Sequence, residues 1–538
     1  MTITQWFIFF LAVQVIHFLG TWKLYVRAGR QAWEAAVPIY NAVILMKIIN
    51  RPWWWTILLF VPIVNLIMFP VVWTETARSF GFNTYKDTAL VVLTLGLYLF
   101  YINYATDAAH IKERDLSPKS TSGEWVSSIL FAIVAATIVH TYFMQPFTIP
   151  TSSLEKTLLV GDYLFVSKFH YGARTPMTTV ATPMLHDAIP FTGAKSYASS
   201  PELPYFRLPG FQKIKRNDIV VFSWPVDTLT VITDTSSEAI YKPVDKKSNY
   251  VKRCVGLPGD SLEVRDGYVY INGERNELPD RARLQFNYKV ISKELLVKPI
   301  KDGRGNFTFP TDFASSRYEI SDITLIAQES QQGPYIHIVS LSDASLKKLE
   351  NNSSIISINK NTFEGGEQDL FPRTKENNWS THNYGPIYIP KEGTTVAITQ
   401  ATIPFYKRII EVYEGSEMGI DNTIGTNGTE VTLNGNPITE YTFKQDYYWM
   451  MGDNRHNSQD ARMWGYTPYT HVVGKPVFVW FSLDPNKNGF FNHIRWDRVF
   501  TTVGGDGKLT SYRYHFLGLV ILYFGFNFFR KKKKQKKA

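Results

Sequence analysis

The sequence predicts two kinds of structure in one chain: a multi-pass α-helical membrane anchor, and a mainly β extracytoplasmic domain with a large inserted subdomain. Four apolar stretches precede residue 150, and a fifth lies near the end of the chain. Between residues 145 and 513 the pattern changes to short runs rich in Val, Ile, Tyr and Phe, separated by Gly, Pro, Asn and Asp. Such runs are typical of strands joined by turns. A chain of 538 residues is long enough for both parts.

The apolar stretches are close in length to the ~20 residues that a helix needs to cross a bilayer. The four before residue 150 are Ile3–Gly20, Trp54–Trp73, Thr88–Ala105 and Trp125–Met144. The first has no basic start and no small-residue cleavage site, which predicts a retained span and not a cleaved signal peptide. The last stretch, Tyr514–Phe529, is short for a span, and a helix lying in the membrane interface is its alternative.

Basic residues set the predicted orientation. They gather in the linker between the first and second stretches and in the linker between the third and fourth, as Lys23, Arg27, Arg30, Lys47, Arg51, Lys112, Arg114 and Lys119. The segment before the first stretch has none, and the turn between the second and third has only Arg78 and Lys86. The positive-inside rule therefore predicts the amino terminus and the residues after Met144 outside, and the basic tail in the cytoplasm.

The net charge of +10 has a local origin, because seven basic residues lie in Arg530–Lys537. A nucleic-acid-binding surface would need Lys and Arg clustered over the folded domain. The tail therefore indicates membrane topology, and no nucleic acid is expected as a partner. The single cysteine, Cys254, excludes an internal disulfide framework and a zinc site with several thiolate ligands.

The apolar stretches and the basic residues together predict five parts of the chain. These are a membrane module with three spans in residues 1–124, a fourth span at 125–144, an extracytoplasmic domain at 145–513, a span at 514–529 and a cytoplasmic tail at 530–538. Within the domain, Asp266–Glu274 and Gly428–Asn436 each predict a strand that enters an Asn-Gly hairpin turn. The stretch between them, about 275–427, is rich in Ser, Asn and Lys but retains Tyr, Phe and Ile. It is therefore predicted to be an inserted subdomain.

Three blocks of this domain combine turn formers with nucleophilic or ionisable side chains. Ile149–Tyr163 (IPTSSLEKTLLVGDY) offers hydroxyls just after a membrane span, Tyr250–Asp260 (YVKRCVGLPGD) embeds a lysine in an apolar strand, and Gly452–Gly465 (GDNRHNSQDARMWG) is a polar turn. Each block taken alone also has a purely structural interpretation, since Ser and Thr cap turns and a strand lysine commonly reaches to water.

Together and in this order, the blocks resemble type I signal peptidase, the membrane-bound Ser-Lys protease that removes signal peptides from exported proteins. The family blocks read approximately P-S-G-S-M-x-P-T-L followed by G-D, then Y-x-K-R-x-x-G-x-P-G-D, then G-D-N-R-D-N-S-x-D-S-R. Lys215–Pro225 resembles the intervening strand of the family. The resemblance covers the core of the domain and includes neither the insert nor the first three spans. It implies a β-rich catalytic domain of the signal peptidase type, anchored in the plasma (inner) membrane.

The resemblance assigns roles to the matching residues. Ser153 falls on the nucleophile, Lys252 on the general base, and Thr151 on the residue whose hydroxyl forms the oxyanion hole with the Ser153 amide. Ser458 falls on the serine that orients the lysine. The supporting network is assigned to Asp453, Arg455, Asp460 and Arg462, and one wall of the substrate cleft to Tyr250 and Val251. The resemblance implies cleavage after small residues at −1 and −3 through an acyl-enzyme, with no metal and no cofactor.

The chain departs from the family pattern at five positions: Ser152 replaces Gly, Leu154 replaces Met, Lys156 replaces Pro, His456 replaces Asp, and Ala461 replaces Ser. Thr151 keeps a donor hydroxyl and Leu154 keeps a similar apolar volume. Ser152 adds a second hydroxyl beside Ser153 and remains an alternative nucleophile.

The proposed chemistry also has a physical requirement. A lysine activates a serine only when it is neutral near pH 7, which requires lowering its pKa from ~10.4 to about 7–8, or roughly 4 kcal/mol. Val251, Val255 and Leu257 provide an apolar strand that could desolvate Lys252, and Arg253 is expected on the opposite face of that strand. Met144 is nine residues from Ser153, so at ~3.3 Å per residue the nucleophile lies within about 30 Å of the membrane.

Other functions fit the sequence less well. Ser153-Leu154-Glu155-Lys156 also spells the S-x-x-K motif of penicillin-recognising serine enzymes, but the S-x-N and K-T-G partners are missing in the required order. A catalytically inactive membrane scaffold that binds exported chains is a second alternative. A transporter is disfavoured because the spans show neither internal repeats nor buried acids. The expected partners are signal-peptide-bearing preproteins, the lipid bilayer and the secretion machinery.

Overall fold

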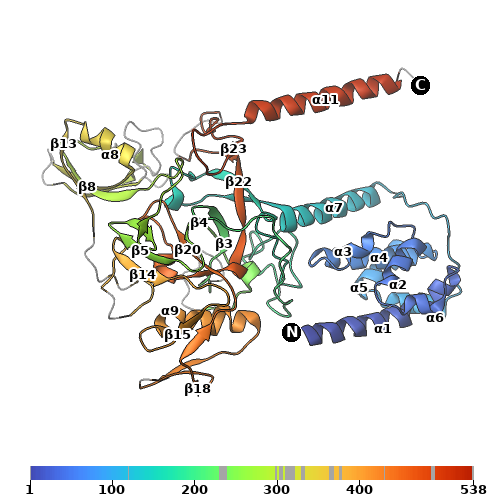
Figure 1. Cartoon of the computed structure of the whole chain (residues 1–538). Helices are drawn as coiled ribbons and strands as arrows, with labels where there is room; N and C mark the ends of the chain where they lie inside the picture. The colour runs from blue at the N-terminus through green and yellow to red at the C-terminus, as the bar shows by residue number, and fades with distance from the viewer. Residues whose placement is uncertain are drawn as a thin grey trace. The chain divides into compact units, whose positions relative to one another are not determined.

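The computed structural model of the chain consists of two compact units, which are considered separately (Figure 1). The described residues are 2–118, 120–229, 239–296, 300–301, 307–308, 322–328, 334–362, 367, 369–374, 378–428, 430–485 and 491–535. The helical unit comprises Met1–Phe143, Arg174–Arg207 and Thr228–Lys247. The sheet unit comprises Met144–Ala173, Leu208–Asp227 and Ser248–Ala538. Lys119 and the end of the basic tail lie outside the described residues.

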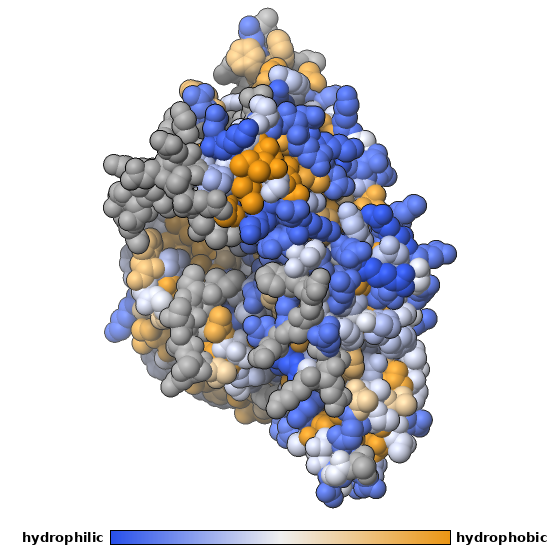
Figure 2. All heavy atoms as spheres, turned by 90° about the vertical axis from the view of Figure 1, so that its left-hand side faces the viewer, coloured by the Kyte–Doolittle hydropathy of each residue, from blue (hydrophilic) through white to orange (hydrophobic). Residues whose placement is uncertain are grey.

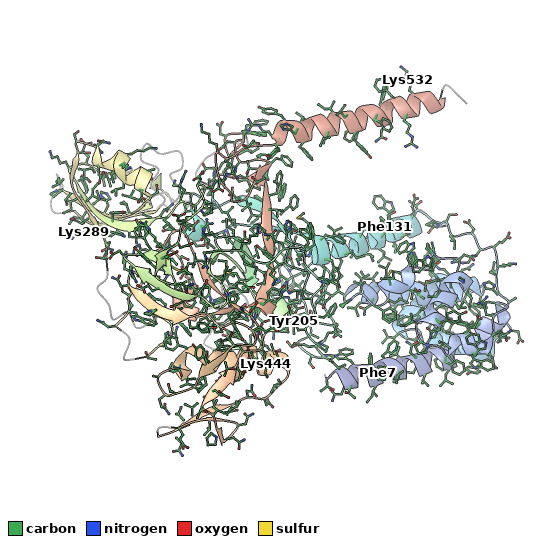
Figure 3. The ribbon with its side chains drawn as sticks, viewed as in Figure 1. Phe7, Phe131, Tyr205, Lys289, Lys444 and Lys532 are labelled. Carbon is green, nitrogen blue, oxygen red and sulfur yellow. The ribbon has the colours of Figure 1, made fainter. Side chains whose placement is uncertain are left out.

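Two helices of the helical unit are long and apolar enough to cross a membrane: α1 (Ile3–Arg27) and the helix Thr121–Phe143, which comprises α7 (Thr121–Ile138) and a π-helical turn, η2 (Val139–Phe143). A capping box starts α1, because the Thr2 hydroxyl accepts the Gln5 N–H and the Gln5 side chain accepts the Thr2 N–H. The Phe7 and Phe131 side chains project from these helices (Figure 3) and are mostly exposed, as lipid-facing residues would be.

Shorter helices fill the sequence between α1 and α7. They are η1 (Ala32–Ala35), α2 (Tyr40–Ile48), α3 (Trp55–Leu58), α4 (Val64–Ser79), α5 (Tyr85–Leu93) and α6 (Tyr98–Ala105). The stretch Trp54–Trp73 is divided between α3 and α4. The stretch Thr88–Ala105 is divided between α5 and α6, which are bent by 116° and meet the length and hydropathy test for a span only as a pair.

The unit also contains a buried acid, which lies outside the four apolar stretches, and a short repeat, only one copy of which lies within a stretch. Glu75 of α4 is buried and bonds the guanidinium groups of Arg51 and Arg114. The sequence V-P-I-x-N also occurs twice, at residues 37–41 and 61–65. The contact of Glu75 with Arg51 and Arg114 joins residues far apart in sequence, so the sequence pattern does not predict it.

The sheet unit is built around an antiparallel sheet with the strand order β1-β2-β22-β3-β4-β20-β21, to which β23 adds beside β22. The strands are β1 (Met144–Thr148), β2 (Asp162–Ser167), β3 (Ile219–Ser223), β4 (Asn249–Gly256), β20 (Tyr447–Met451), β21 (Thr467–Pro468), β22 (Val472–Ser482) and β23 (Thr501–Thr502). The central strands β3 and β20 are buried along their whole length.

Strand alternation divides the core of this sheet into two layers. On β3, Ile219 and Val221 pack with Leu154 in one apolar cluster, whereas Val220 and Phe222 pack with Cys254 in another. Because both faces of β3 are covered, its sequence is a continuous apolar run instead of an alternating one. β4 lies between β3 and β20, which puts Lys252 in the middle of a buried sheet.

A second group of strands follows β4. β5 (Ser261–Arg265), β6 (Tyr268–Ile271), β7 (Glu274–Arg275) and β14 (Tyr384–Tyr388) form one sheet, and β16 (Ile424–Asn427), β17 (Glu430–Leu433) and β18 (Asn436–Pro437) form another. Near them lie the paired strands β15 (Thr395–Ala397) and β19 (Glu440–Thr442) and the short helix α9 (Ile403–Arg408). Both predicted Asn-Gly turns are confirmed: Asn272-Gly273 joins β6 to β7, Asn434-Gly435 joins β17 to β18, and all four residues have positive φ.

The predicted insert contains a small subdomain with its own core. Its sheet has the order β11-β12-β8-β13 and is accompanied by α8 (Asp343–Glu350). The strands are β8 (Phe286–Ser292), β11 (Asp322–Gln328), β12 (Tyr335–Leu341) and β13 (Ile355–Lys360). Two further short strands, β9 (Ile300–Lys301) and β10 (Phe307–Thr308), pair with each other. The later part of the predicted range packs with the main domain, since β14 pairs with β5.

Hydrophilic side chains cover much of the face shown in Figure 2, as expected for a surface in contact with water. The chain ends in the helix α11 (Arg513–Gln535), which contains the stretch Tyr514–Phe529 and carries Lys532 near its end (Figure 3). Among the described helices, α11 is not one of those that are both long and apolar enough to cross a membrane.

A buried ion pair between Asp162, at the start of β2, and Arg498 provides a test of the fold. Asp162 accepts hydrogen bonds from the Arg498 guanidinium, the Ser482 hydroxyl and the Leu159 N–H. We expect Asp162→Asn to lower the free energy of unfolding by about 3–5 kcal/mol, because it leaves a buried arginine without its carboxylate. Chemical denaturation of the purified protein measures this change. Glu263→Gln, which removes the partner of the exposed Arg265, should change it by less than about 1 kcal/mol. Equal effects of the two substitutions would contradict the expectation.

Candidate active site

A tight loop between β1 and β2 holds the three predicted hydroxyl residues. The 3-10 turn η3 (Ser152–Leu154) follows Thr151, and the loop is closed by hydrogen bonds between Ile149 and the pair Gly161 and Asp162. Gly161 has φ +88°, and a Cβ on it would lie 2.1 Å from the Leu483 carbonyl oxygen. The loop therefore requires glycine where it rejoins the sheet.

Lys252 of β4 reaches the hydroxyl of Ser153. Its Nζ donates a hydrogen bond of 2.9 Å to Ser153 Oγ, and both side chains are buried, with exposed fractions of 4% for Lys252 and 7% for Ser153. Burial lowers the pKa of Lys252 to about 8, although the carboxylates of Asp460 and Asp453 act in the opposite direction. A substantial fraction of the amine is therefore neutral near pH 8, the protonation state that a base needs.

The two neighbouring hydroxyls have different environments. Ser152 Oγ accepts a 2.9 Å hydrogen bond from the Asn457 side-chain amide, whereas Ser153 Oγ accepts from the Lys252 amine. Thr151 is exposed, precedes η3 in an extended conformation and makes no capping bond with its side chain. Of the two serines, it is Ser153 that lies at hydrogen-bonding distance from the lysine.

The predicted cleft residues Tyr250 and Val251 lie on β4 beside Lys252. The half-buried ring of Tyr250 stacks on Trp224, with centroids 5.1 Å apart and planes 6° apart, and meets the edge of Trp464 at 5.5 Å. Lys252 Nζ lies 5.2 Å from the centre of the same Tyr250 ring. Val251 packs against the apolar cluster that contains Leu154. An aromatic wall therefore lies next to the amine.

The third block contributes two buried carboxylates, each held by an arginine. Asp453 accepts hydrogen bonds of 2.7 and 2.6 Å from Arg253, and Asp460 accepts bonds of 2.9 and 2.8 Å from Arg462. Burial alone would raise the pKa of each carboxyl, but the adjacent guanidinium keeps both pKa values below the usual range. Both groups therefore stay ionised at neutral pH.

The Asp453–Arg253 pair was not predicted. Arg253 was expected only to face away from the site, yet it is 1% exposed and forms a two-point ion pair with Asp453. Thr157 also donates its hydroxyl to Asp453, at 2.7 Å. The available signal was an arginine within an apolar strand, since a buried guanidinium requires a charged partner.

The remaining predicted support residues join the same cluster. Arg462 donates a 2.6 Å bond to the carbonyl of Arg455, and Arg455 donates one of 2.9 Å to the carbonyl of Gly267. Burial lowers the pKa of the Arg455 guanidinium to about 10, so it remains a cation at neutral pH. These bonds connect the third block to the turn between β5 and β6.

Backbone contacts fix the third block against the nucleophile loop. The Asn454 N–H donates to the Ser153 carbonyl at 3.1 Å. A Cβ on Gly452 would lie 2.6 Å from that carbonyl oxygen and 2.2 Å from Ser458 Oγ, so only glycine fits there. Ser458 is buried, and within the described part of the chain its hydroxyl makes no hydrogen bond, to Lys252 or to any other group.

His456, which replaces the family aspartate, connects the third block to the insert. Its Nδ1 accepts the Asn287 N–H at 3.0 Å, and its Nε2 lies 2.6 Å from Nε2 of His382. Burial, and to a smaller extent the neighbouring His382, lowers the pKa of His456 to about 3. A neutral imidazole therefore stands where the family has a carboxylate.

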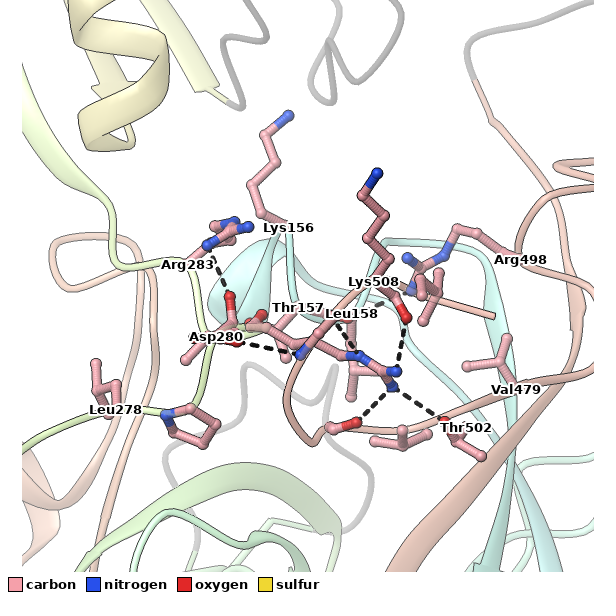
Figure 4. A pocket seen from close by; sticks show the side chains of 17 residues that line it. Lys156, Thr157, Leu158, Leu278, Asp280, Arg283, Val479, Arg498, Thr502 and Lys508 are labelled. Atoms are coloured by element: carbon pink, nitrogen blue, oxygen red, sulfur yellow. Dashed lines mark hydrogen bonds between the residues drawn. The ribbon is translucent and has the colours of Figure 1, made fainter. Parts of the chain in front are cut away.

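Lys156, the lysine of the S-x-x-K string, lines a cavity of about 750 Å³ beyond the loop (Figure 4). The side chains of Lys156, Arg283 and Lys508 lie around this cavity. Lys156 has φ +70°, and η3 ends two residues before it, at Leu154. The string therefore does not open a helix, as the penicillin-recognising motif requires.

Comparisons with known proteins match both parts of the chain. The family described as signal peptidase, peptidase S26, matches residues 122–306 and 388–481, just over half of the chain. A family of unknown function, DUF5684, matches residues 33–113. The gap in the first match covers most of the inserted subdomain, and the second match covers the short helices between α1 and α7.

Curated relatives agree with the larger match. Signal peptidase I of Buchnera aphidicola subsp. Acyrthosiphon pisum is 23% identical over 376 residues, which cover 70% of this chain and 80% of the relative. Signal peptidase I of Rickettsia canadensis is 31% identical over 159 residues, 30% of this chain and 46% of the relative. The fold and these matches define a membrane protein that is a serine peptidase. The chain belongs to the signal peptidase I family, peptidase S26, whose members cleave signal peptides.

The burial of Lys252 predicts a measurable loss of stability. Lowering its pKa from 10.5 to about 8 corresponds to roughly 3 kcal/mol against folding at neutral pH, where the folded protein must hold a poorly solvated cation. Between pH 8 and 10.5 the unfolded chain binds more protons, so the penalty disappears as pH rises through this window. We expect Lys252→Met to raise the free energy of unfolding by about 2–3 kcal/mol at pH 7 and by little at pH 10.5.

Chemical denaturation at both pH values measures this difference. Lys475→Met is the matched control, because Lys475 is partly exposed and forms an ion pair with Asp218 at 2.8 Å. This control should not become more stable at pH 7. If Lys252→Met gives no gain at pH 7, the buried amine does not destabilise the fold.

Proposed function

We propose that Ser153 and Lys252 are the catalytic dyad of this signal peptidase. The observation that carries the proposal is the 2.9 Å hydrogen bond between Lys252 Nζ and Ser153 Oγ in a buried setting that lowers the pKa of the lysine to about 8. The reaction is cleavage of preproteins after small residues at −1 and −3 through an acyl-enzyme. The aromatic wall around Tyr250 and the backbone of β4 form one side of the cleft that binds the extended substrate.

In this mechanism neutral Lys252 takes the proton of Ser153 Oγ as the oxygen attacks the scissile carbonyl carbon. The negative charge then moves to the carbonyl oxygen, which is bound by the Ser153 N–H and the Thr151 hydroxyl. Each such donor is worth about 3–4 kcal/mol. The Lys252 ammonium returns the proton to the leaving amine, and the same amine then activates the water that hydrolyses the ester.

The supporting residues keep the lysine in a protonation state that can react. Asp453 and Asp460 are each neutralised by an arginine, so their attraction for the Lys252 cation is weakened. Ser458 lies beside Gly452 at the loop of Ser153. We assign it the role of orienting the lysine amine from its place in the family pattern, since its hydroxyl is not bonded to Lys252 here. Arg455 and Arg462 hold the block that carries both carboxylates.

We further propose that the sheet unit is extracytoplasmic and that the basic tail that starts within α11, at Arg530, is cytoplasmic. The support is the distribution of Lys and Arg along the chain together with two helices that are long and apolar enough to cross. The β1 strand follows directly on the end of the second of these helices, at Phe143. A nucleophile within about 30 Å of the membrane suits a substrate whose signal peptide is still in the bilayer.

Cleavage of a preprotein with an Ala-x-Ala site tests the dyad. We expect Ser153→Ala and Lys252→Ala to lower kcat/KM by at least about 10³-fold, because the first removes the nucleophile and the second removes its base. Ser152→Ala and Lys156→Ala should stay within about tenfold of the unmodified protein. Purified protein in detergent or vesicles, with the products separated by gel electrophoresis, provides the measurement.

Each rival function gives a different pattern in the same assay. Cleavage that survives in Ser153→Ala but is lost in Ser152→Ala would make Ser152 the nucleophile. Loss in Lys156→Ala with retention in Lys252→Ala would favour the S-x-x-K interpretation. A folded unmodified protein that cuts no preprotein would favour the inactive scaffold.

The pH dependence tests the role of the amine. Since Lys252 is active only when neutral, kcat/KM should fall about tenfold for each pH unit below a pKa near 8 and level off above it. The control Lys475→Met should show the same acid limb. A limb that lies below pH 6 would indicate another base.

A further inference from the structure

The short helices between α1 and α7 begin with a repeated turn. Residues 37–41 read V-P-I-Y-N, and residues 61–65 read V-P-I-V-N. Ile39 has φ 67° and ψ −49°, Ile63 has φ 69° and ψ −46°, and the next residue starts α2 and α4 respectively. A positive φ is costly for a β-branched residue. The same strained conformation at both places indicates that one structural unit occurs twice. The unit is a turn followed by a helix that reverses the direction of the chain.

A third turn joins α5 to α6. Leu95 has φ 51° and Gly96 has φ 85°, and the two helices are bent by 116°. A Cβ on Gly96 would lie 2.8 Å from the ring of Trp73, so the turn packs closely on α4. Between α1 and α7 the chain therefore makes three turns of this kind.

The segments of chain before and after these turns have their ends close together, around Glu75. Arg51 and Arg114 both bond Glu75 at the far end of α4, Arg51 at 2.8 Å. Arg78 also contacts this carboxylate, at 3.4 Å. Arg51 precedes the second turn, Arg78 follows it and Arg114 follows the third turn. These segments of the chain thus meet at the Glu75 carboxylate.

Further hydrogen bonds extend this meeting point. They join Arg27 to the Thr106 carbonyl at 2.7 Å, the Ile111 N–H to the Ser79 carbonyl at 2.9 Å, the Asn50 amide to the Lys112 carbonyl at 2.8 Å, and His110 Nε2 to the Ile48 carbonyl oxygen at 2.9 Å. The last residue of α1 is therefore at the same end as the other segment ends.

The turns themselves lie along α1, away from that end. The Asn41 amide donates to Gln14 at 2.7 Å, and the ring of Phe60 is 6.3 Å from that of Phe10. At 1.5 Å per residue, these α1 positions are about 20 and 25 Å from Arg27. Ile63 packs against Ala181 and Tyr197 of the same unit. The first two turns therefore lie about 20–25 Å along α1 from Arg27, and the chain comes back to the Arg27 end after each of them.

The exposed side chains differ between the two ends. At the turns, Ile39, Phe60 and Leu95 are 53%, 50% and 73% exposed. Near the shared end, Trp53 and Trp54 are exposed beside Arg51. Apolar residues on turns fit hydrocarbon, whereas Trp and Arg suit a headgroup interface. In the segment that leads to the second turn, backbone N–H groups bond carbonyl oxygens three residues earlier, as lipid surroundings require. The donors are Trp55, Thr56, Ile57, Leu59, Phe60 and Val61.

We infer that residues 28–114 form three helical hairpins that enter the bilayer from one face and return to it, with the exposed side chains of Ile39, Phe60 and Leu95 at their turns in contact with lipid acyl chains. Only α1 and Thr121–Phe143 then cross the membrane before the sheet unit. This inference replaces two predicted crossings, Trp54–Trp73 and Thr88–Ala105, by hairpins. It keeps the catalytic domain on the predicted side, because removing two crossings leaves the parity unchanged. It does not rest on the proposed dyad.

Single cysteines distinguish the two topologies. Asn83, between α4 and α5, is exposed and lies at the shared end in the hairpin arrangement, whereas two full crossings put it on the opposite side. The full chain carries Asn83→Cys, Lys112→Cys or Glu274→Cys in turn, and intact cells and inverted vesicles are treated with a membrane-impermeant maleimide. Cys254 is buried, and the unsubstituted protein shows its background labelling.

We expect Asn83→Cys and Lys112→Cys to label from one side and Glu274→Cys from the other. Leu95→Cys should label at least tenfold more slowly than Asn83→Cys from either side, because it lies in hydrocarbon. Labelling of Asn83→Cys from the Glu274 side would overturn the hairpins in favour of full crossings. Labelling of all three from one side would overturn the crossing by Thr121–Phe143, and fast labelling of Leu95→Cys would overturn the lipid contact. Signal peptide cleavage, measured on the same variants, is independent of these outcomes.

Discussion

The sheet unit is organised around one energetically costly feature, an amine buried in the middle of a sheet. Lys252 sits on β4 between two strands that are buried along their length. Two carboxylates lie near enough to act on its pKa, and either of them alone would stabilise the cation. Each is instead bound by an arginine, Asp453 by Arg253 and Asp460 by Arg462. Desolvation therefore remains the largest influence on the amine, and the fold gives up stability to keep the amine close to neutrality.

The third block links this amine to the nucleophile loop and to the insert. Its backbone holds the Ser153 carbonyl through Asn454, and its side chains reach Ser152 through Asn457. On the other side, His456 contacts Asn287 of the insert, with a neutral imidazole in place of the carboxylate of the family pattern. The insert is thus fastened to the same turn that supports the serine. The bond from Asn454 to Ser153 joins two backbone groups, so it holds the loop whatever the protonation state of Lys252.

The helical unit obeys a different constraint, which is the satisfaction of polar groups within lipid. Glu75 is buried, and its charge is balanced by arginines from segments far apart in sequence. In the proposed hairpin arrangement, this cluster joins the ends of successive hairpins. In the arrangement that we propose, the residues that match a family of unknown function form a membrane-embedded module beside the peptidase in the sequence.

Elements with a local signal could be predicted from the sequence. Long apolar runs gave α1 and the helix that leads into the sheet, Asn-Gly pairs gave two hairpins, and three ordered blocks predicted the meeting of Ser153 and Lys252. Tertiary structure alone decided which charges pair, and so the contacts of Arg253 and Thr157 with Asp453 were missed. It also decided that Arg51, Glu75 and Arg114 meet. Hydropathy measures how many residues could cross a bilayer but not where the chain goes next, because the direction of return is set by contacts between residues that lie far apart in sequence.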